Sequence, residues 1–455
     1  MRRDELRAPS TAVVSISGSN YLDRASLLEA SISVHEPTWD FYALLVDLDD
    51  ASLAGPAGIS RVMTPEDLSI DPVDLAAMSL FYNITEFSTA LKPFALRHLL
   101  DIGYDRVYYI DPDIELFGPL IESQVLLDSY DVVLTPHTLA PIPDDGREPS
   151  HDQIRASGSF NLGFFAGTSG CRHLLNWWAD CLTWGSGIEI HNNLFTDQRW
   201  MDFAPSYALT GVLRHPGYNV AYWNMHERRL SGVPGNYRVN TEKLRFMHYS
   251  GYDPAQPWTL AKYIRNRPRV RLADSPTLAE MFDSYGERLI SWSLGNGRRT
   301  ILDRPYTRNQ SPTLGRIEDH HAMLLRHQLH TEKVQTGCPL RLMPGETGME
   351  ALERWLLTPI PGAGPRSLPR IIQLIWENRP DLQSVFPDPT EFDREDFTRW
   401  WSETGSVEHS FPPHLLEGGM TTRLGRVSLG APESATERDA SPGSAQAVGN
   451  VVGYL

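Results

Sequence analysis

The sequence predicts an α/β protein built on a mainly parallel sheet, and its first segments carry that prediction. Residues 12–17, AVVSIS, form an apolar run that predicts a buried strand, and the turn-forming Gly18-Ser19-Asn20 follows it. Helical spacing of apolar side chains covers 23–35, and a second strand-like run covers 41–46. A strand, a helix and a strand in this order make the βαβ unit that builds parallel sheets.

The same alternation continues and leads to an acidic turn. Residues 87–100 have helical spacing and end near Gly103, and the strand predicted over 106–110 runs into Asp111-Pro112-Asp113. The remaining expectations are strands at 131–134 and 160–166, a helix at 172–184, and a mobile surface loop at 136–157, rich in Pro, Gly and Asp.

The length and the local composition indicate more than one structural part. With 455 residues the chain exceeds the usual size of a single domain. We expect a catalytic domain over 11–270 and a smaller, mainly helical region over 271–416. Residues 417–455 are rich in Gly, Ser, Ala and charge, and we expect a disordered tail there.

Charge and cysteine content limit the partners and the compartment. A formal net charge of −16 argues against a nucleic-acid partner, because such binding depends on Lys and Arg at the phosphates. The three cysteines form no CxxC or Cys/His cluster, so neither a disulfide framework nor a cysteine-based zinc site is expected. No apolar run is long enough for a membrane span. These features favour a cytoplasmic protein.

Asp111 and Asp113 form the acidic pair that indicates chemistry. They follow a buried strand, and ligands of open α/β sheets collect at the carboxyl ends of strands. Two carboxylates at this spacing can turn toward one divalent ion, and their hard oxygens suit Mn²⁺ or Mg²⁺ beside a diphosphate. A solvated turn is the alternative, and it is our interpretation of the second Asp-x-Asp, Asp47-Leu48-Asp49.

Several further motifs stand in a fixed order between Val13 and Trp258, and together with the acidic pair they resemble glycosyltransferase family 8. The motifs are Ser19-Asn20-Tyr21, Lys92-Pro93-Phe94, Tyr109-Ile110-Asp111-Pro112-Asp113, Phe160-Asn161-Leu162-Gly163, Asp197-Gln198 and His248-Tyr249-Ser250-Gly251. The resemblance implies a GT-A fold, a Rossmann-like sheet of nucleotide-diphospho-sugar transferases flanked by helices, here with a smaller C-terminal helical module.

The resemblance also implies roles for individual residues. The metal ligands would be Asp111, Asp113 and His248, holding Mn²⁺ or Mg²⁺. Contacts to the nucleotide-sugar donor would come from Tyr21, stacked on the base, and from Ser19, Lys92, Asp111 and Gly251. Catalytic contacts beside the donor sugar would come from Asn161, Asp197 and Gln198. The alternatives are a core histidine at His248, a strand cap at Asn161 and a helix N-cap at Asp197.

One part of the last motif departs from the family. Gln256 stands where the family has a diphosphate-binding lysine, and two extra residues precede Pro257-Trp258. Lys92, Arg245 or Lys262 could supply the missing charge.

The segment 215–229 mixes aromatic and hydrogen-bonding side chains. We expect Asn224 and His226 to contact the acceptor or the donor sugar, with a packed surface loop as the alternative.

The function implied is metal-dependent transfer of a sugar from a nucleotide-sugar donor, a UDP-sugar with retention of configuration. The acceptor would be a glycan, a lipid-linked molecule or a protein. Residues 368–388 resemble a helical appendage of bacterial polysaccharide glycosyltransferases, which indicates surface polysaccharide synthesis. Two other classes stay open: a non-catalytic nucleotide-sugar-binding protein, and a haloacid-dehalogenase-like phosphatase, although phosphatases of that class carry their Asp-x-Asp on the first strand.

Overall fold

The computed structural model describes residues 9–47, 58–264, 266–295, 298–337, 340–360 and 367–416. The chain divides after Arg308 into two compact units, which we describe separately.

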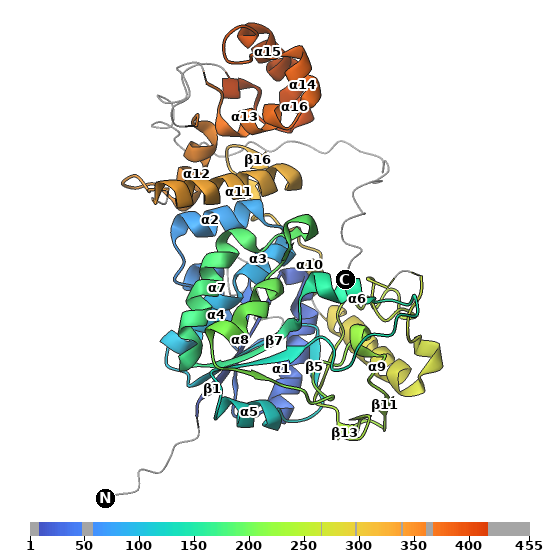
Figure 1. Cartoon of the computed structure of the whole chain (residues 1–455). Coiled ribbons are helices and arrows are strands. Elements are labelled where there is room, and N and C mark those ends of the chain that lie inside the picture. Colours follow the sequence, from blue (N-terminus) through green and yellow to red (C-terminus); the bar gives the residue numbers. More distant parts are fainter. Residues whose placement is uncertain are drawn as a thin grey trace, which may run out of the picture. The chain divides into compact units, whose positions relative to one another are not determined.

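A seven-stranded sheet forms the centre of the first unit, within the residues that the structure describes (Figure 1). The strand order is β10-β6-β7-β4-β1-β2-β3, and every strand is parallel to its neighbours except β7, which is antiparallel to both β4 and β6. The strands are β1 (Thr11–Ser17), β2 (Asp40–Leu45), β3 (Val62–Met63), β4 (Arg106–Ile110), β6 (Val132–Pro136), β7 (Phe160–Thr168) and β10 (Thr210–Val212). The predicted α/β class with a mainly parallel sheet is confirmed.

Helices cover both faces of this sheet because its strands are apolar on both sides. Along β1, Ala12, Val14 and Ile16 belong to one core cluster, while Val13 belongs to the other. The first cluster packs against α2 (Pro72–Phe81), α3 (Ile84–Ala90), α4 (Lys92–Asp101) and α7 (Arg172–Gly185). The second packs against α1 (Leu22–His35) and α5 (Ile121–Leu127).

The helix predicted over 87–100 is two helices, α3 and α4, with Leu91 between them. Pro93 is the second residue of α4, where its missing N–H costs no hydrogen bond and its fixed φ favours a helix start. This break makes Lys92 the first residue of α4.

The segment 136–157 is more structured than the expected surface loop. It contains α6 (His151–Ser157), which Ser150 and Gln153 cap reciprocally. The guanidinium of Arg269 also donates to Asp145 and to the carbonyl oxygens of Pro143, Arg147 and Pro149. Sequence composition did not show this long-range anchor.

The first unit extends past the boundary expected at residue 270. Helix α9 (Pro276–Ser293) buries Leu278, Phe282 and Tyr285 against residues of the 220–261 region. The short α10 (Arg298–Leu302) packs on the second core cluster through Ile301 and Leu302. These contacts explain why the division lies after Arg308.

The second unit is mainly helical over its described residues. Its helices are α11 (Asp319–Thr336), α12 (Gly348–Leu357), α13 (Arg370–Glu377), α14 (Pro380–Val385), α15 (Arg394–Trp400) and α16 (Ser406–Glu408). A partly buried ion pair between Arg370 and Glu332 joins α13 to α11. The tail expected over 417–455 lies outside the described residues.

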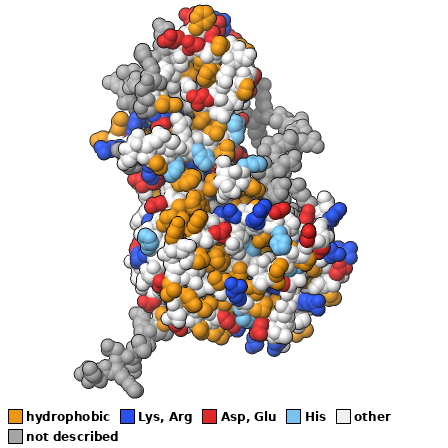
Figure 2. Space-filling view, viewed as in Figure 1, with side chains coloured by type: hydrophobic (Ala, Val, Ile, Leu, Met, Phe, Trp, Pro, Cys, Tyr) orange, Lys and Arg blue, Asp and Glu red, His pale blue; other side chains and the backbone are white. Residues whose placement is uncertain are grey.

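On the face shown in Figure 2, acidic and basic side chains are interspersed over the described residues. In the same part of the chain, every helix is too short or too polar to cross a membrane. Cys171 is buried and Cys181 half-buried, both with free thiols, and Cys338 lies outside the described residues.

Candidate functional site

Three strand ends meet at one edge of the sheet. The parallel strands β1 and β4 run into Gly18–Tyr21 and Asp111–Asp113 at this edge. Because β7 runs the other way, its first residues, Phe160 to Gly163, lie there too, and the Asp111 N–H donates to the Gly163 carbonyl at 2.9 Å. One antiparallel strand therefore brings the Phe-Asn-Leu-Gly motif to the acidic pair.

A short strand pairing adds His248 to the same edge. Strand β14 (Phe246–His248) pairs antiparallel with β5 (Ile114–Leu116), and His248 lies opposite Ile114. The Tyr249 N–H also donates to the Asp113 carbonyl at 2.9 Å. Backbone register thus places His248 beside Asp113, although the two are far apart in sequence.

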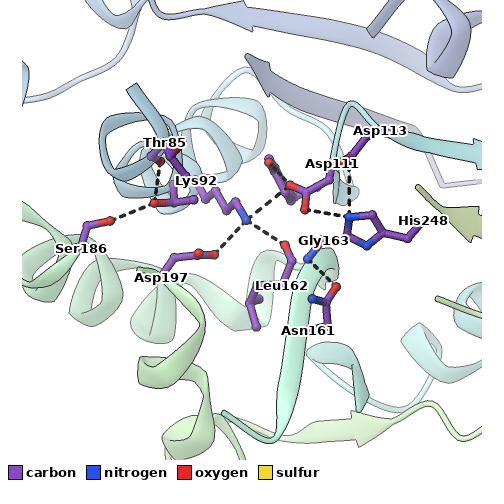
Figure 3. A network of polar contacts seen from close by, with 12 residues as sticks. Thr85, Lys92, Asp111, Asp113, Asn161, Leu162, Gly163, Ser186, Asp197 and His248 are labelled. Atoms are coloured by element: carbon purple, nitrogen blue, oxygen red, sulfur yellow. Dashed lines mark hydrogen bonds and ion pairs between the residues drawn. The ribbon is translucent and has the colours of Figure 1, made fainter. Parts of the chain in front are cut away.

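Asp111, Asp113 and His248 converge as a candidate metal site (Figure 3). The His248 Nε2 atom lies 3.1 Å from Asp113 Oδ1 and 3.6 Å from Asp111 Oδ2. One ligand atom from each of the three lies within 4.8 Å of the others. Two carboxylates and an imidazole form a donor set that suits a divalent cation such as Mn²⁺. The residues that the resemblance implied as ligands therefore fit a metal in chemistry and position.

Asn219 orients the His248 ring from behind, and sequence reasoning missed it. Its amide nitrogen donates to Thr135 Oγ1 and Asn161 Oδ1, each at 2.9 Å. Its amide oxygen is then left to accept from His248 Nδ1, at 3.1 Å. This bond turns Nε2 toward the carboxylates, as metal-binding histidines require. Asn219 is fully buried and has φ 51°, a left-handed conformation that Asn tolerates better than most residues.

Charges in the site favour a positive charge at His248 Nε2. Burial opposes ionisation of Asp113, but His248, aided by Arg24, holds the pKa of this carboxyl below its ordinary value. Burial also opposes protonation of His248, and the Asp113 carboxylate outweighs it and raises the pKa of the imidazole. A divalent cation would benefit from the same field.

Gly163 leaves the space in which the side chains of Asp111 and His248 lie against strand β7. A Cβ atom at this position would lie 2.5 Å from His248 Cε1 and 2.8 Å from Asp111 Oδ2, far inside contact distance. The glycine of the Phe-Asn-Leu-Gly motif is therefore needed for space.

Lys92 forms the centre of a buried charge cluster next to the acidic pair (Figure 3). Its ammonium donates to the Leu162 carbonyl at 2.9 Å, and it lies 2.9 Å from Asp197 Oδ2 and 3.6 Å from Asp111 Oδ1. The Tyr109 ring lies 4.2 Å from the ammonium, and the Tyr109 hydroxyl donates to Asp111 Oδ1 at 2.5 Å. Lys92 thus links Asp111 to Asp197.

Asp197 is held by Lys92, although it stands at the start of a 3-10 helix, Gln198–Phe203. Its side chain makes no capping hydrogen bond, so the N-cap alternative does not describe it. Burial raises the pKa of Asp197, and the Lys92 ammonium offsets this only in part. Gln198 is buried next to it. The site therefore contains three carboxylates, those of Asp111, Asp113 and Asp197, and one ammonium, that of Lys92. A divalent cation would balance this excess of negative charge.

Asn161 and the two residues expected to contact sugars have internal partners. Asn161 Oδ1 accepts from Gly163 N and Asn219 Nδ2, so Asn161 supports the site from within. Asn224 is fully buried, and its amide nitrogen donates to the carbonyls of His137 and Asn219. His226 Nε2 lies 3.1 Å from the Ala140 carbonyl. The structure places Asn224 and His226 in a packed loop, which is the alternative that the sequence left open.

In the turn that follows β1, Gly18–Tyr21, the role of Asp47 differs from the expectation. Ser19 is fully buried, and its N–H and hydroxyl both donate to the Asp47 carboxylate. Asp47, interpreted as a solvated strand end, instead anchors this turn, while Asp49 lies outside the described residues. Tyr21 is half-buried, and the Arg24 guanidinium lies 4.4 Å from the centre of its ring.

Among the cations considered for the missing lysine, Lys262 has the most accessible ammonium. Arg245 is paired with Glu122, and Lys92 is buried in its cluster. Lys262 is exposed, and its backbone N–H donates to the Gly251 carbonyl at 2.9 Å. Gly251 has φ +71°, and a Cβ there would lie 2.5 Å from the Tyr263 ring, so its glycine serves this turn.

No protein-family model matches the chain. The uncharacterized protein YfnD of Bacillus subtilis is 23% identical over 271 residues, which cover 57% of this chain and 83% of YfnD.

Among solved structures, the chain is similar to the galactosyltransferase LgtC in complex with donor and acceptor sugar analogs, with a TM-score of 0.38 and 16% identity over 64% of this chain and 99% of LgtC. The glycosyltransferase GlyE of Streptococcus pneumoniae is similar with a TM-score of 0.35 and 14% identity, over 66% of each chain. Likenesses at these scores carry no argument about activity, so the function is inferred from the site.

We predict that Gly163→Ala weakens Mn²⁺ binding by about tenfold or more, because the new methyl group displaces Asp111 and His248. Isothermal titration with Mn²⁺ measures the change. Gly167→Ala is the matched control on the same strand, since its Cβ would meet Cys171 and Phe165 and not the site. Equal Mn²⁺ affinities in the two variants would contradict the assigned role of Gly163.

We also predict that Lys92→Met lowers the free energy of unfolding by about 3–5 kcal/mol, because it leaves Asp197 buried without its cation. Adding Asp197→Leu should recover much of this loss in a thermal or urea unfolding experiment. If the double variant is no more stable than Lys92→Met, the ion pair is not the reason for the burial of these groups.

Proposed function

We propose that this protein is a metal-dependent glycosyltransferase that uses a nucleotide-sugar donor. The observation that carries the proposal is the convergence of Asp111, Asp113 and His248 at the ligand edge of the sheet, beside the Lys92–Asp197 cluster. The finer assignments, a UDP-sugar donor, retention of configuration, Mn²⁺ or Mg²⁺ as the ion, and a glycan acceptor in surface polysaccharide synthesis, draw on the resemblance to glycosyltransferase family 8.

The chemistry of sugar transfer explains why such a site is useful. As a nucleoside diphosphate leaves a sugar, negative charge grows on the phosphate and positive charge on the anomeric carbon. A divalent cation held by Asp111, Asp113 and His248 would stabilise the charge on the leaving phosphate.

Side chains that the fold already holds in place would orient the donor sugar and bind the base. Asp197 is a buried carboxyl group paired with Lys92, and with Gln198 it is our candidate for orienting the donor sugar. Lys92 fixes the orientation of Asp197 through their ion pair, so we assign it a positioning role and not a direct phosphate contact. Tyr21 supplies a flat ring for the base at the neighbouring strand end.

The two alternative classes differ from this proposal in observable ways. A phosphatase of the haloacid-dehalogenase type would place its acidic pair on the first strand, whereas here the pair follows β4 and the first strand is followed by Gly18-Ser19. A binding protein without activity would bind a donor in the presence of metal but would not turn it over.

The decisive experiment incubates the protein with UDP-, GDP- and dTDP-sugars, with and without Mn²⁺, and measures the released nucleoside diphosphate and donor binding. We expect turnover of a UDP-sugar that needs metal and falls by about 100-fold or more in Asp113→Asn and in His248→Ala, because several kcal/mol of charge stabilisation are lost. Asp128→Asn and His173→Ala, both exposed, are the matched controls and should keep wild-type rates.

The outcomes separate the classes. Metal-dependent binding without turnover in the presence of candidate acceptors would favour the binding protein, and failure of every donor to bind would remove the proposal. With an active donor, proton NMR of the product gives the anomeric configuration, and inversion would contradict the retaining assignment.

Lys262 is our candidate for the phosphate charge that Gln256 does not supply. We predict that Lys262→Met raises the KM for the donor by about tenfold with little change in kcat, as expected for one lost hydrogen bond to a charged group. Lys243→Met, at an exposed position on β13 (Glu242–Lys243), is the control. An unchanged KM in Lys262→Met would exclude this role.

A further inference from the structure

A second group of side chains of the types that bind metals lies in the helical unit, and the proposed transferase activity makes no use of it. Glu318 immediately precedes α11, and His320 and His321 belong to its first turn. His409 follows α16 and comes to the same place through the fold of the second unit. Glu318, His320 and His321 are close in sequence, so only the approach of His409 is a property of the tertiary structure.

Two imidazoles face one carboxylate oxygen in this group. The Nδ1 atoms of His320 and His321 lie 3.6 Å and 3.9 Å from Glu318 Oε2. Ligand atoms of Glu318, His320 and His321 all lie within 4.8 Å of one another. Two ligand atoms on one tetrahedral zinc ion are separated by roughly 3.4 Å, given bond lengths of about 2.1 Å. The His320 and His321 rings now lie closer together than on one tetrahedral ion, with centroids 3.7 Å apart, so binding one ion would require the exposed His320 ring to rotate away from His321.

His409 lies next to His321 but outside the set of ligand atoms within 4.8 Å of one another, so its ring would have to move to join them on one ion. Its ring centroid is 5.3 Å from that of His321. Two imidazoles bound to one tetrahedral ion have centroids roughly 5.2 Å apart by the same geometry. The His409 ring is stacked on Trp401, which belongs to the π-helical turn Trp401–Gly405, and such turns recur at functional sites.

The buried ring nitrogens of this group lack partners among the described residues. His321 and His409 are only 1% and 5% exposed. His321 Nδ1 and both ring nitrogens of His409 make no hydrogen bond in this part of the chain. Burying one polar atom without a partner costs about 1–3 kcal/mol. This cluster contains three such atoms. A metal ion would give these nitrogens a partner.

The charges around the group also allow a cation. The nearby Arg379 acts electrostatically on His321 and His409, but its guanidinium is paired with Asp381 and Glu408. Those two carboxylates outweigh the arginine, and Glu318 adds a further negative charge.

We propose that Glu318, His320, His321 and His409 form a second metal site, which takes Zn²⁺ or a related late first-row divalent cation. Imidazole-rich donor sets favour these metals over Mg²⁺ and Mn²⁺. The site lies within the second unit and does not depend on the transferase assignment. Its chemistry differs from that of the aspartate-rich site on the sheet, so the two are distinguishable by metal preference.

The test uses full-length protein carrying Asp113→Asn and His248→Ala, which disable the first site. After removal of metal with a chelator, Co²⁺ is titrated as a spectroscopic probe and Zn²⁺ as its competitor, and bound zinc is counted by mass spectrometry. We expect one ion per chain, visible cobalt d–d absorption typical of nitrogen ligation, and displacement by Zn²⁺.

Two exposed ligands then provide variants that should fold. Adding Glu318→Gln and His320→Ala should weaken Zn²⁺ binding by about tenfold or more, whereas His414→Ala, an exposed histidine of the same unit, should leave it unchanged. Absence of a bound ion, or binding that is the same with and without the Glu318 and His320 substitutions, would overturn the proposal and leave a packed histidine cluster.

Discussion

The ammonium of Lys92 is the interaction on which the arrangement of the site depends. It is held by a backbone carbonyl of β7 and by carboxylates from two other segments, so one cation ties together the end of β4, the start of β7 and the loop before residue 198. A buried carboxylate such as Asp197 is tolerated only beside such a partner. The break between α3 and α4 makes Lys92 the first residue of α4, and from there its ammonium reaches the end of β4 and the start of β7.

Packing around this cluster leaves little freedom. Gly163 allows Asp111 and His248 to approach the sheet, and Asn219 fixes the ring from the opposite side. Tyr109 holds one oxygen of Asp111, so each oxygen of that carboxylate has a defined direction. The result is a site whose geometry is set before any ligand arrives, which is the condition for effective electrostatic stabilisation.

Sequence reasoning predicted those parts of the site whose signals are local or ordered along the chain. The sheet class followed from alternating strands and helices, and Asp111 and Asp113 followed from their place after a strand. His248 came from motif order, and the pairing of β5 with β14 explains its position. Asn219 was missed because its role comes from three contacts distant in sequence. The hydrogen-bonding side chains of 215–229 predicted sugar contacts, yet Asn224 and Asn219 serve the interior. Composition alone does not distinguish a side chain that binds a ligand from one that forms hydrogen bonds with buried backbone groups.

The pairing of β5 with β14 has a consequence for how the protein is made. The acidic pair is in place once β1, β4 and β7 have assembled, but its histidine arrives on a strand that the ribosome completes much later. Contacts of such large sequence separation form slowly, because a long loop must close first. His248 is therefore on the last strand of the candidate site to be synthesised, and its approach to the acidic pair depends on the pairing of β5 with β14.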